Sequence, residues 1–154
     1  MNRKRKVFDV KPYDNFDVIF RLAIYKTRKE MLSAIEADVK KQGGVSIADS
    51  YTMGMFRLMP SVVDNDIPGT CYSDMFGAMY LNLADATDEI VIHECAHAAF
   101  AWEYNIRHYA GTFDDDDGGM DEQEAYCYFL GRIADIVMKT VKDYKRNGKG
   151  IQPR

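Results

Sequence analysis

Two histidines and a glutamate within five residues are the part of this sequence whose types and spacing suit chemistry. The segment is His93-Glu94-Cys95-Ala96-His97, an H-E-x-x-H pattern. Residues four apart share one face of an α-helix, so the rings of His93 and His97 can bind one ion at about 2.0–2.1 Å. Two imidazoles and one carboxylate leave a fourth position for water, which predicts one Zn²⁺ ion as cofactor. Glu94 is the predicted catalytic residue, a general base that takes a proton from the metal-bound water.

The residues around the motif indicate a buried helix. Two of the chain's three histidines fall in the motif, and buried histidines need polar partners. A metal site is therefore favoured over two core histidines that bond to backbone groups. The flanking residues are apolar or small: Val91, Ile92, Ala96, Ala98, Ala99, Phe100 and Ala101.

A third metal ligand must come from outside the motif. His108 lies 11 residues beyond His97, whereas the metzincin pattern places its third histidine about 6 beyond the second. An acid on the next predicted helix is the remaining choice. The start of that helix offers Asp121, Glu122 and Glu124.

Glu122 and Glu124 are alternatives, because residues two apart on a helix are separated by roughly 200° of rotation. Glu122 lies nearer the centre of the apolar stripe of its helix. Glu124 shares its stripe with the small residues Cys127 and Gly131, where another helix can approach closely. The spacing alone leaves both glutamates open.

Periodicity and turn signals predict the elements that must position these residues. We expect an α+β fold with a small, mostly antiparallel sheet and helices on one face. Thr27 and Glu30 form a capping box for the first helix. Strands are expected at 7–10 and 16–25 as a hairpin, then at 45–48, 55–59 and 75–83, with helices from 28 to the glycines at 43–44, at 88–106 and at 121–145.

The bulk composition describes one domain that spans residues 1–154. The chain is 47% hydrophobic and 29% charged with a net charge of −4, which excludes an intrinsically disordered protein. No stretch reaches the roughly 18 apolar residues of a membrane span, so no membrane partner is expected. No signal peptide is recognisable, and three cysteines fit a reducing compartment. The predicted location is the cytoplasm.

The charges are segregated along the chain. Residues 1–6 form a basic arm, 108–120 an acidic loop between the two predicted metal-binding helices, and 148–154 a flexible tail. The acidic loop does not fit a calcium-binding loop, because Ala125 falls where a bidentate glutamate is required. No nucleic-acid-binding motif accompanies the basic arm, so nucleic acid is not favoured as a partner.

The two motifs together resemble those of small zincin-like metallopeptidases encoded by phages and prophages. These proteins carry H-E-C-x-H-A and, after a variable loop, an acid followed by E-x-x-A-Y with a glycine seven residues after the glutamate. Residues 93–98 match the first motif, and residues 124–128 with Gly131 match the second, with Cys127 in place of alanine. The resemblance covers about residues 75–140. More distantly, the chain is similar to the minimal gluzincins of the ImmA/IrrE and SprT types.

This resemblance implies a minimal zincin-like domain with an active-site helix and a C-terminal helix that bears the third ligand. It favours Glu124 as that ligand, with Glu122 as the alternate. It also implies that the strand before the active-site helix, residues 75–81, is a sheet edge to which an extended peptide can add. For a phage-encoded protein, the location would be the cytosol of the host cell.

The predicted function is zinc-dependent peptide hydrolysis, with a protein or peptide of unknown identity as substrate. The alternative is a catalytically inactive zincin-fold protein that sequesters a host or phage partner. Both hypotheses predict bound zinc, so metal analysis alone does not distinguish them.

Overall fold

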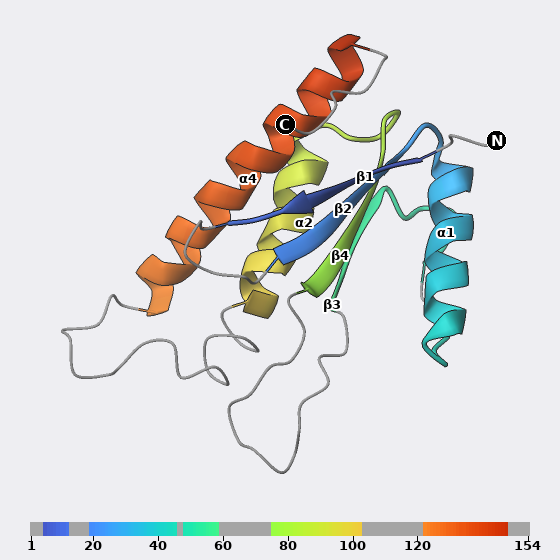
Figure 1. Ribbon diagram of the computed structural model, residues 1–154, viewed down its shortest axis with the longest axis horizontal. Coiled ribbons are helices and arrows are strands. Elements are labelled where there is room, and N and C mark those ends of the chain that lie inside the picture. Colours follow the sequence, from blue (N-terminus) through green and yellow to red (C-terminus); the bar gives the residue numbers. More distant parts are fainter. Residues whose placement is uncertain (1–4, 13–18, 46–47, 59–74, 103–121, 148–154) are drawn as a thin grey trace.

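The structure, a computed structural model, describes residues 5–12, 19–45, 48–58, 75–102 and 122–147. These residues form an α+β arrangement, as predicted, and Figure 1 shows the order of its elements. In chain order they are β1 (Arg5–Val10), β2 (Ile19–Tyr25), α1 (Arg28–Lys41), β3 (Gly54–Leu58), β4 (Met75–Asn82), α2 (Asp88–Ala101) and α4 (Glu122–Asn147).

The four strands form one mixed sheet in the order β1-β2-β4-β3. β1 and β2 pair antiparallel, which confirms the predicted hairpin pairing, and β3 and β4 also pair antiparallel. β2 and β4 pair parallel, so β4 begins at the same end of the sheet as β2. Two of the three pairings are therefore antiparallel. Of the strand expected at 45–48, Val45 and Ala48 are outside any strand, and residues 46–47 are not described.

The strand that precedes α2 is not the edge of this sheet, so the prediction of a sheet edge at residues 75–81 is wrong. β4 lies between β2 and β3, and the edges are β1 and β3. Residues 76–82 are all buried, because layers of side chains cover β4 on both faces. A nearly continuous apolar run is typical of such a central strand.

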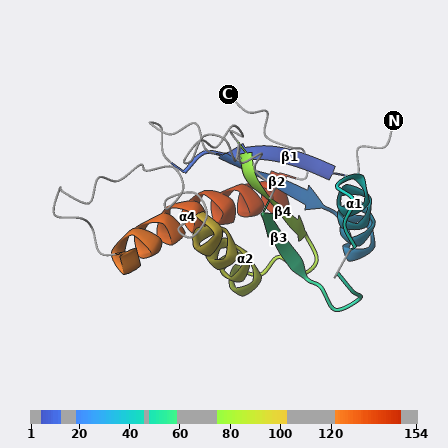
Figure 2. The same cartoon turned by 90° about the horizontal axis from the view of Figure 1, so that it is seen from below.

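Helices cover both faces of the sheet, which corrects the expectation of helices on one face. On one face, α2 and α4 enclose a core around Phe20, Met79 and Phe129. On the other face, Met31, Ile35 and Val39 of α1 pack on four residues that point away from that core: Ala23, Tyr25, Ala78 and Tyr80. Figures 1 and 2 show the sheet between the α2–α4 pair and α1.

The helix starts follow from their capping residues. Thr27 Oγ1 accepts a hydrogen bond from the Glu30 N–H at 3.3 Å, and Glu30 Oε2 accepts one from the Thr27 N–H at 3.3 Å, which confirms the predicted capping box. Thr87 caps α2 in the same way, with its hydroxyl accepting from the Ile90 N–H.

Several predicted segments fall outside the described residues: 1–4 of the basic arm, the acidic loop at 108–120 and the tail at 148–154. His108 and Asp121 are also outside them. Among the helices that the structure does describe, none combines the length and the apolar character needed to cross a membrane.

Candidate metal centre

Helix α2 brings the two motif histidines together at its surface. The Nε2 atoms of His93 and His97 lie 3.2 Å apart, with the rings edge to face. Two nitrogens bound to one tetrahedral zinc ion at 2.0–2.1 Å would be about 3.4 Å apart, so the pair fits this donor set. A direct N–H···N hydrogen bond fits the same distance. Metal binding needs both Nε2 lone pairs and therefore places the ring protons on Nδ1.

The histidines and the glutamate of the motif differ in their contact with solvent. His93 and His97 are exposed, as are Ile92 and Phe100, whereas Glu94 is only 5% exposed. The expectation that the whole motif is buried is therefore wrong for the two histidines. The apolar flanks did not distinguish one face of the helix from the other. The core face of α2 carries Val91, Cys95, Ala98 and Ala99.

Glu94 is the buried polar group of this centre. Burial of its side chain raises the pKa of the carboxyl above its ordinary value. A hydrogen bond from the Phe56 backbone N–H and the nearby rings of His93 and His97 act in the opposite direction. Glu94 is therefore held between the edge strand and the histidine pair, with its proton affinity increased.

A cleft of about 570 Å³ runs between α2 and the edge strand β3. One wall is β3 with the residues that precede it, and the other is the first three turns of α2. Because β3 is an edge strand, part of its backbone faces this cleft rather than β4. The lining residues are Tyr51, Thr52, Met53, Gly54, Met55, Phe56, Glu89, Ile90, His93, Glu94 and His97.

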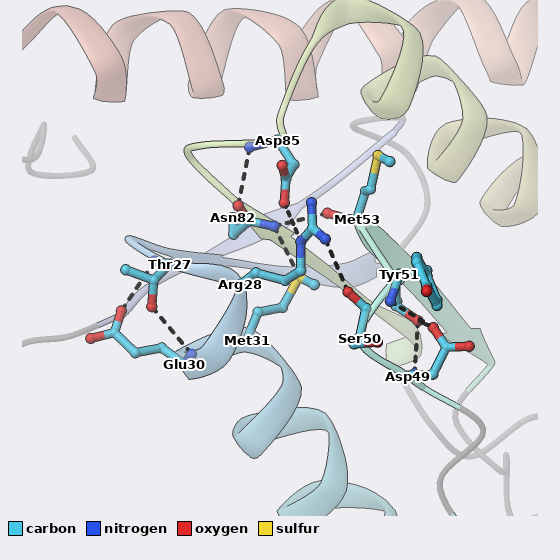
Figure 3. Close-up of polar contacts among 11 residues, drawn as sticks. Thr27, Arg28, Glu30, Met31, Asp49, Ser50, Tyr51, Met53, Asn82 and Asp85 are labelled. Carbon is cyan, nitrogen blue, oxygen red and sulfur yellow. Dashed lines mark hydrogen bonds and ion pairs between the residues drawn. The ribbon is translucent and has the colours of Figure 1, made fainter.

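A network of hydrogen bonds connects the segment before β3 with the turn before α2, where the two walls of the cleft begin (Figure 3). Arg28 at the start of α1 donates to Asp85 Oδ2 at 2.7 Å and to the Ser50 carbonyl at 2.9 Å. The fully buried Asn82 donates to the Met53 carbonyl at 3.0 Å and accepts from the Asp85 N–H at 3.1 Å. The segment before β3 and the turn before α2 thus share the same anchors.

This network was not predicted from the sequence. The sequence signal for the network was Asn82, an asparagine at the end of an otherwise apolar strand. A buried amide at such a place needs specific hydrogen-bond partners. Nothing in the sequence identifies the partners themselves, since Met53 contributes only its backbone carbonyl.

The structure does not bring Glu124 into a ligand group with the histidines. The side chain of Glu124 is exposed, and within the described ranges no three His, Cys, Asp or Glu side chains lie close enough to hold a metal ion. The side chain of Glu122 is outside the described set. The choice between the two glutamates remains a prediction.

The start of α4 is nevertheless anchored beside α2. The rings of Trp102 and Phe129 stack with their centroids 4.4 Å apart, and Ala125 is buried. The third ligand predicted from this helix keeps its two candidate positions, Glu122 and Glu124.

Comparisons with protein-family models, curated proteins and solved structures find no match to this chain. The chemistry of the cleft residues is therefore the basis for a functional assignment.

Proposed function

We propose that this protein is a zinc-dependent peptidase of the gluzincin type with a minimal zincin-like domain. His93 and His97 are two of its metal ligands, Glu94 is its general base, and Glu122 or Glu124 is the third ligand. The convergence of the two Nε2 atoms, 3.2 Å apart at a cleft beside a buried carboxylate, is the observation that carries the proposal.

The positions of these side chains support distinct roles in hydrolysis. When bound, zinc supplies a Lewis acid that polarises a carbonyl group and makes water acidic near neutral pH. Glu94 accepts the proton of the attacking water and passes it to the leaving amine.

The edge strand supports an extended peptide as substrate. A peptide that adds to the free edge of β3 would lie along the cleft, with its backbone near Glu94. The strand that offers this edge is Gly54–Leu58. Tyr51 and Met53 are exposed at the rim and offer apolar surface to substrate side chains.

Cleavage by the purified, zinc-loaded chain tests the proposal, with a peptide library as substrate and Glu94→Gln as the matched variant. Loss of a general base typically lowers the rate by about 10²–10⁴-fold. We expect the variant to bind zinc as the wild type does and to lose cleavage to that extent. Equal cleavage by both proteins would remove Glu94 from the mechanism. Absence of cleavage in the wild type, with zinc bound, would favour a binding protein that sequesters a partner.

The third ligand is tested by Glu122→Gln and Glu124→Gln, each measured for zinc affinity by titration calorimetry. The variant that loses affinity identifies the ligand. Unchanged affinity in both variants would exclude both glutamates as the third ligand.

A further inference from the structure

Gly54 lies where the edge strand β3 comes closest to the buried base on α2. It is the first residue of β3 and pairs in register with Leu81 of β4. Glycine in a strand weakens it and often marks a close approach of another part of the chain. Backbone conformation does not explain the glycine here, because among the described glycines a positive φ is recorded only at Gly43.

The space around Gly54 explains its lack of a side chain. A Cβ added there would lie 3.0 Å from Glu94 Cγ, 3.0 Å from Leu81 Cδ2 and 3.2 Å from Ile90 Cγ2. These separations are shorter than an ordinary carbon–carbon contact of about 3.5–4.0 Å. A methyl group at position 54 therefore requires each of these neighbours to give by a few tenths of an ångström.

Glu94 is the neighbour that can move most readily. Leu81 is fully buried in the core between β4 and the helices, where a shift would disturb many contacts. Ile90 is partly buried against the same core. The Glu94 side chain, in contrast, borders the cleft, which leaves space for another rotamer.

We propose that Gly54 is a positioning residue that fixes the place of the Glu94 carboxylate between the edge strand and the histidine pair. The inference rests on the peptidase function proposed above, because Gly54 acts through the base of that reaction. The three atoms nearest to a Cβ at position 54 include none of His93 or His97, so the expected displacement concerns the base and not the proposed metal ligands.

Gly54→Ala tests this role. A misplacement of about 1 Å can cost roughly 100-fold in rate, so we expect kcat to fall about 10- to 100-fold. The KM and the zinc affinity should be unchanged, because neither the edge strand nor the histidines lose a contact. A crystal structure of the variant should show the Glu94 carboxylate displaced from its wild-type place.

Gly44→Ala is the matched control. A Cβ at Gly44 would lie 3.0 Å from Val39 Cγ1, an equally tight contact, but on α1 and away from the cleft. We expect this variant to keep the wild-type kcat. An equal loss of kcat in both variants would assign the effect to general strain and overturn the proposal.

Two further results would overturn the proposed role of Gly54. One is a wild-type kcat in Gly54→Ala, and the other is a Glu94 carboxylate that has not moved in the crystal structure of this variant. If the wild type cleaves no peptide, the proposed function fails, and the position of Glu94 in the crystal structure alone decides the role of Gly54.

A second variant covers the case in which Gly54→Ala does not fold. Gly54→Ala with Leu81→Val removes the Leu81 Cδ2 contact and exchanges one methyl group for another, which cores tolerate well. The new Cβ still meets Glu94 Cγ in this variant, so the same loss of kcat is expected.

Discussion

The side chains of the proposed centre combine exposed ligands with a buried base. His93 and His97 face solvent, which allows an ion to reach them, while Glu94 is held under the edge strand. The sequence predicts that the two histidines share one face of a helix, because they are four residues apart, and the structure places their Nε2 atoms 3.2 Å from each other. The apolar flanks predicted burial of the whole motif, which holds for Glu94 alone among these three side chains, but they did not identify the strand that covers it, β3, which lies 36 or more residues earlier in the chain.

Tyr80, on the other face of the sheet, provides a test of pH dependence. Its hydroxyl donates to Asp38 Oδ2 at 2.9 Å, and burial together with this bond raises its pKa to about 12. An unfolded tyrosine ionises near pH 10, so the contribution of Tyr80 to stability is complete below about pH 10 and is lost as the pH rises towards 12.

We therefore expect the stability advantage of the wild type over Tyr80→Phe to shrink by on the order of 2 kcal/mol between pH 9 and pH 11.5. Urea unfolding of both proteins at the two pH values measures this change. A constant difference would show that Tyr80 ionises in the folded chain as it does in the unfolded one.

Among the elements, the sequence patterns of β3 and β4 do not determine where these two strands lie in the sheet. The run from Met75 to Asn82 predicts a strand, but apolar residues on both sides do not say which strands will flank it. β3 is short, with an unremarkable pattern, yet its position opposite α2 creates the cleft. Periodicity predicts the elements of this chain, whereas their order in the sheet depends on contacts between distant segments.

Gly77 tests how closely β3 packs against β4, and Gly131 on α4 serves as a comparison. A Cβ at Gly77 of β4 would lie 2.2 Å from Phe56 Cζ and 2.9 Å from the Arg57 carbonyl oxygen. Gly77→Ala should therefore lower the free energy of unfolding by about 1–3 kcal/mol, the typical cost of overpacking. A Cβ at Gly131 on α4 would meet no atom of the described residues within 4 Å, so Gly131→Ala should raise the free energy of unfolding by up to about 1 kcal/mol. Chemical denaturation of both variants measures these changes, and the same sign in both would contradict the argument.

Asn82 tests the network that joins the two walls of the cleft. Asn82→Ala leaves the Met53 carbonyl and the Asp85 N–H without the amide that pairs them. Each unsatisfied buried group costs about 1–3 kcal/mol, so we expect a loss of roughly 2–4 kcal/mol in urea unfolding. Thr27→Ala, which removes the exposed cap of α1, should cost only about 1 kcal/mol. Equal losses in the two variants would show that the Asn82 bonds contribute little.

At the scale of the whole molecule, the sheet separates two hydrophobic clusters, and one of them includes residues of the helix that carries the proposed centre. The cluster with α2 and α4 includes Cys95 and Ala98 from the motif helix itself. The cluster under α1 supports the centre indirectly, through the anchors that Arg28 provides. Because both clusters consist of side-chain packing, the fold does not depend on an ion for its core.

Metal removal should therefore lower stability without unfolding the chain. At a zinc concentration about 100-fold above the dissociation constant, binding contributes about 2.7 kcal/mol, which corresponds to roughly 5–10 °C in Tm for a chain of this size. We expect calorimetry after chelation to show a single cooperative transition at this lower Tm, with zinc restoring the original value.

His93→Ala and His97→Ala should each unfold at the Tm that the wild type shows after chelation, whether or not zinc is added. Each variant keeps only one imidazole of the pair. A zinc-dependent rise in their Tm would place the ion elsewhere on the chain. Loss of the cooperative transition after chelation would show instead that the ion is part of the folding core, as in small zinc domains whose binding energy is their folding energy. The two packed clusters predict that a cooperative transition remains after chelation, since each cluster buries its apolar side chains without a contribution from the cleft.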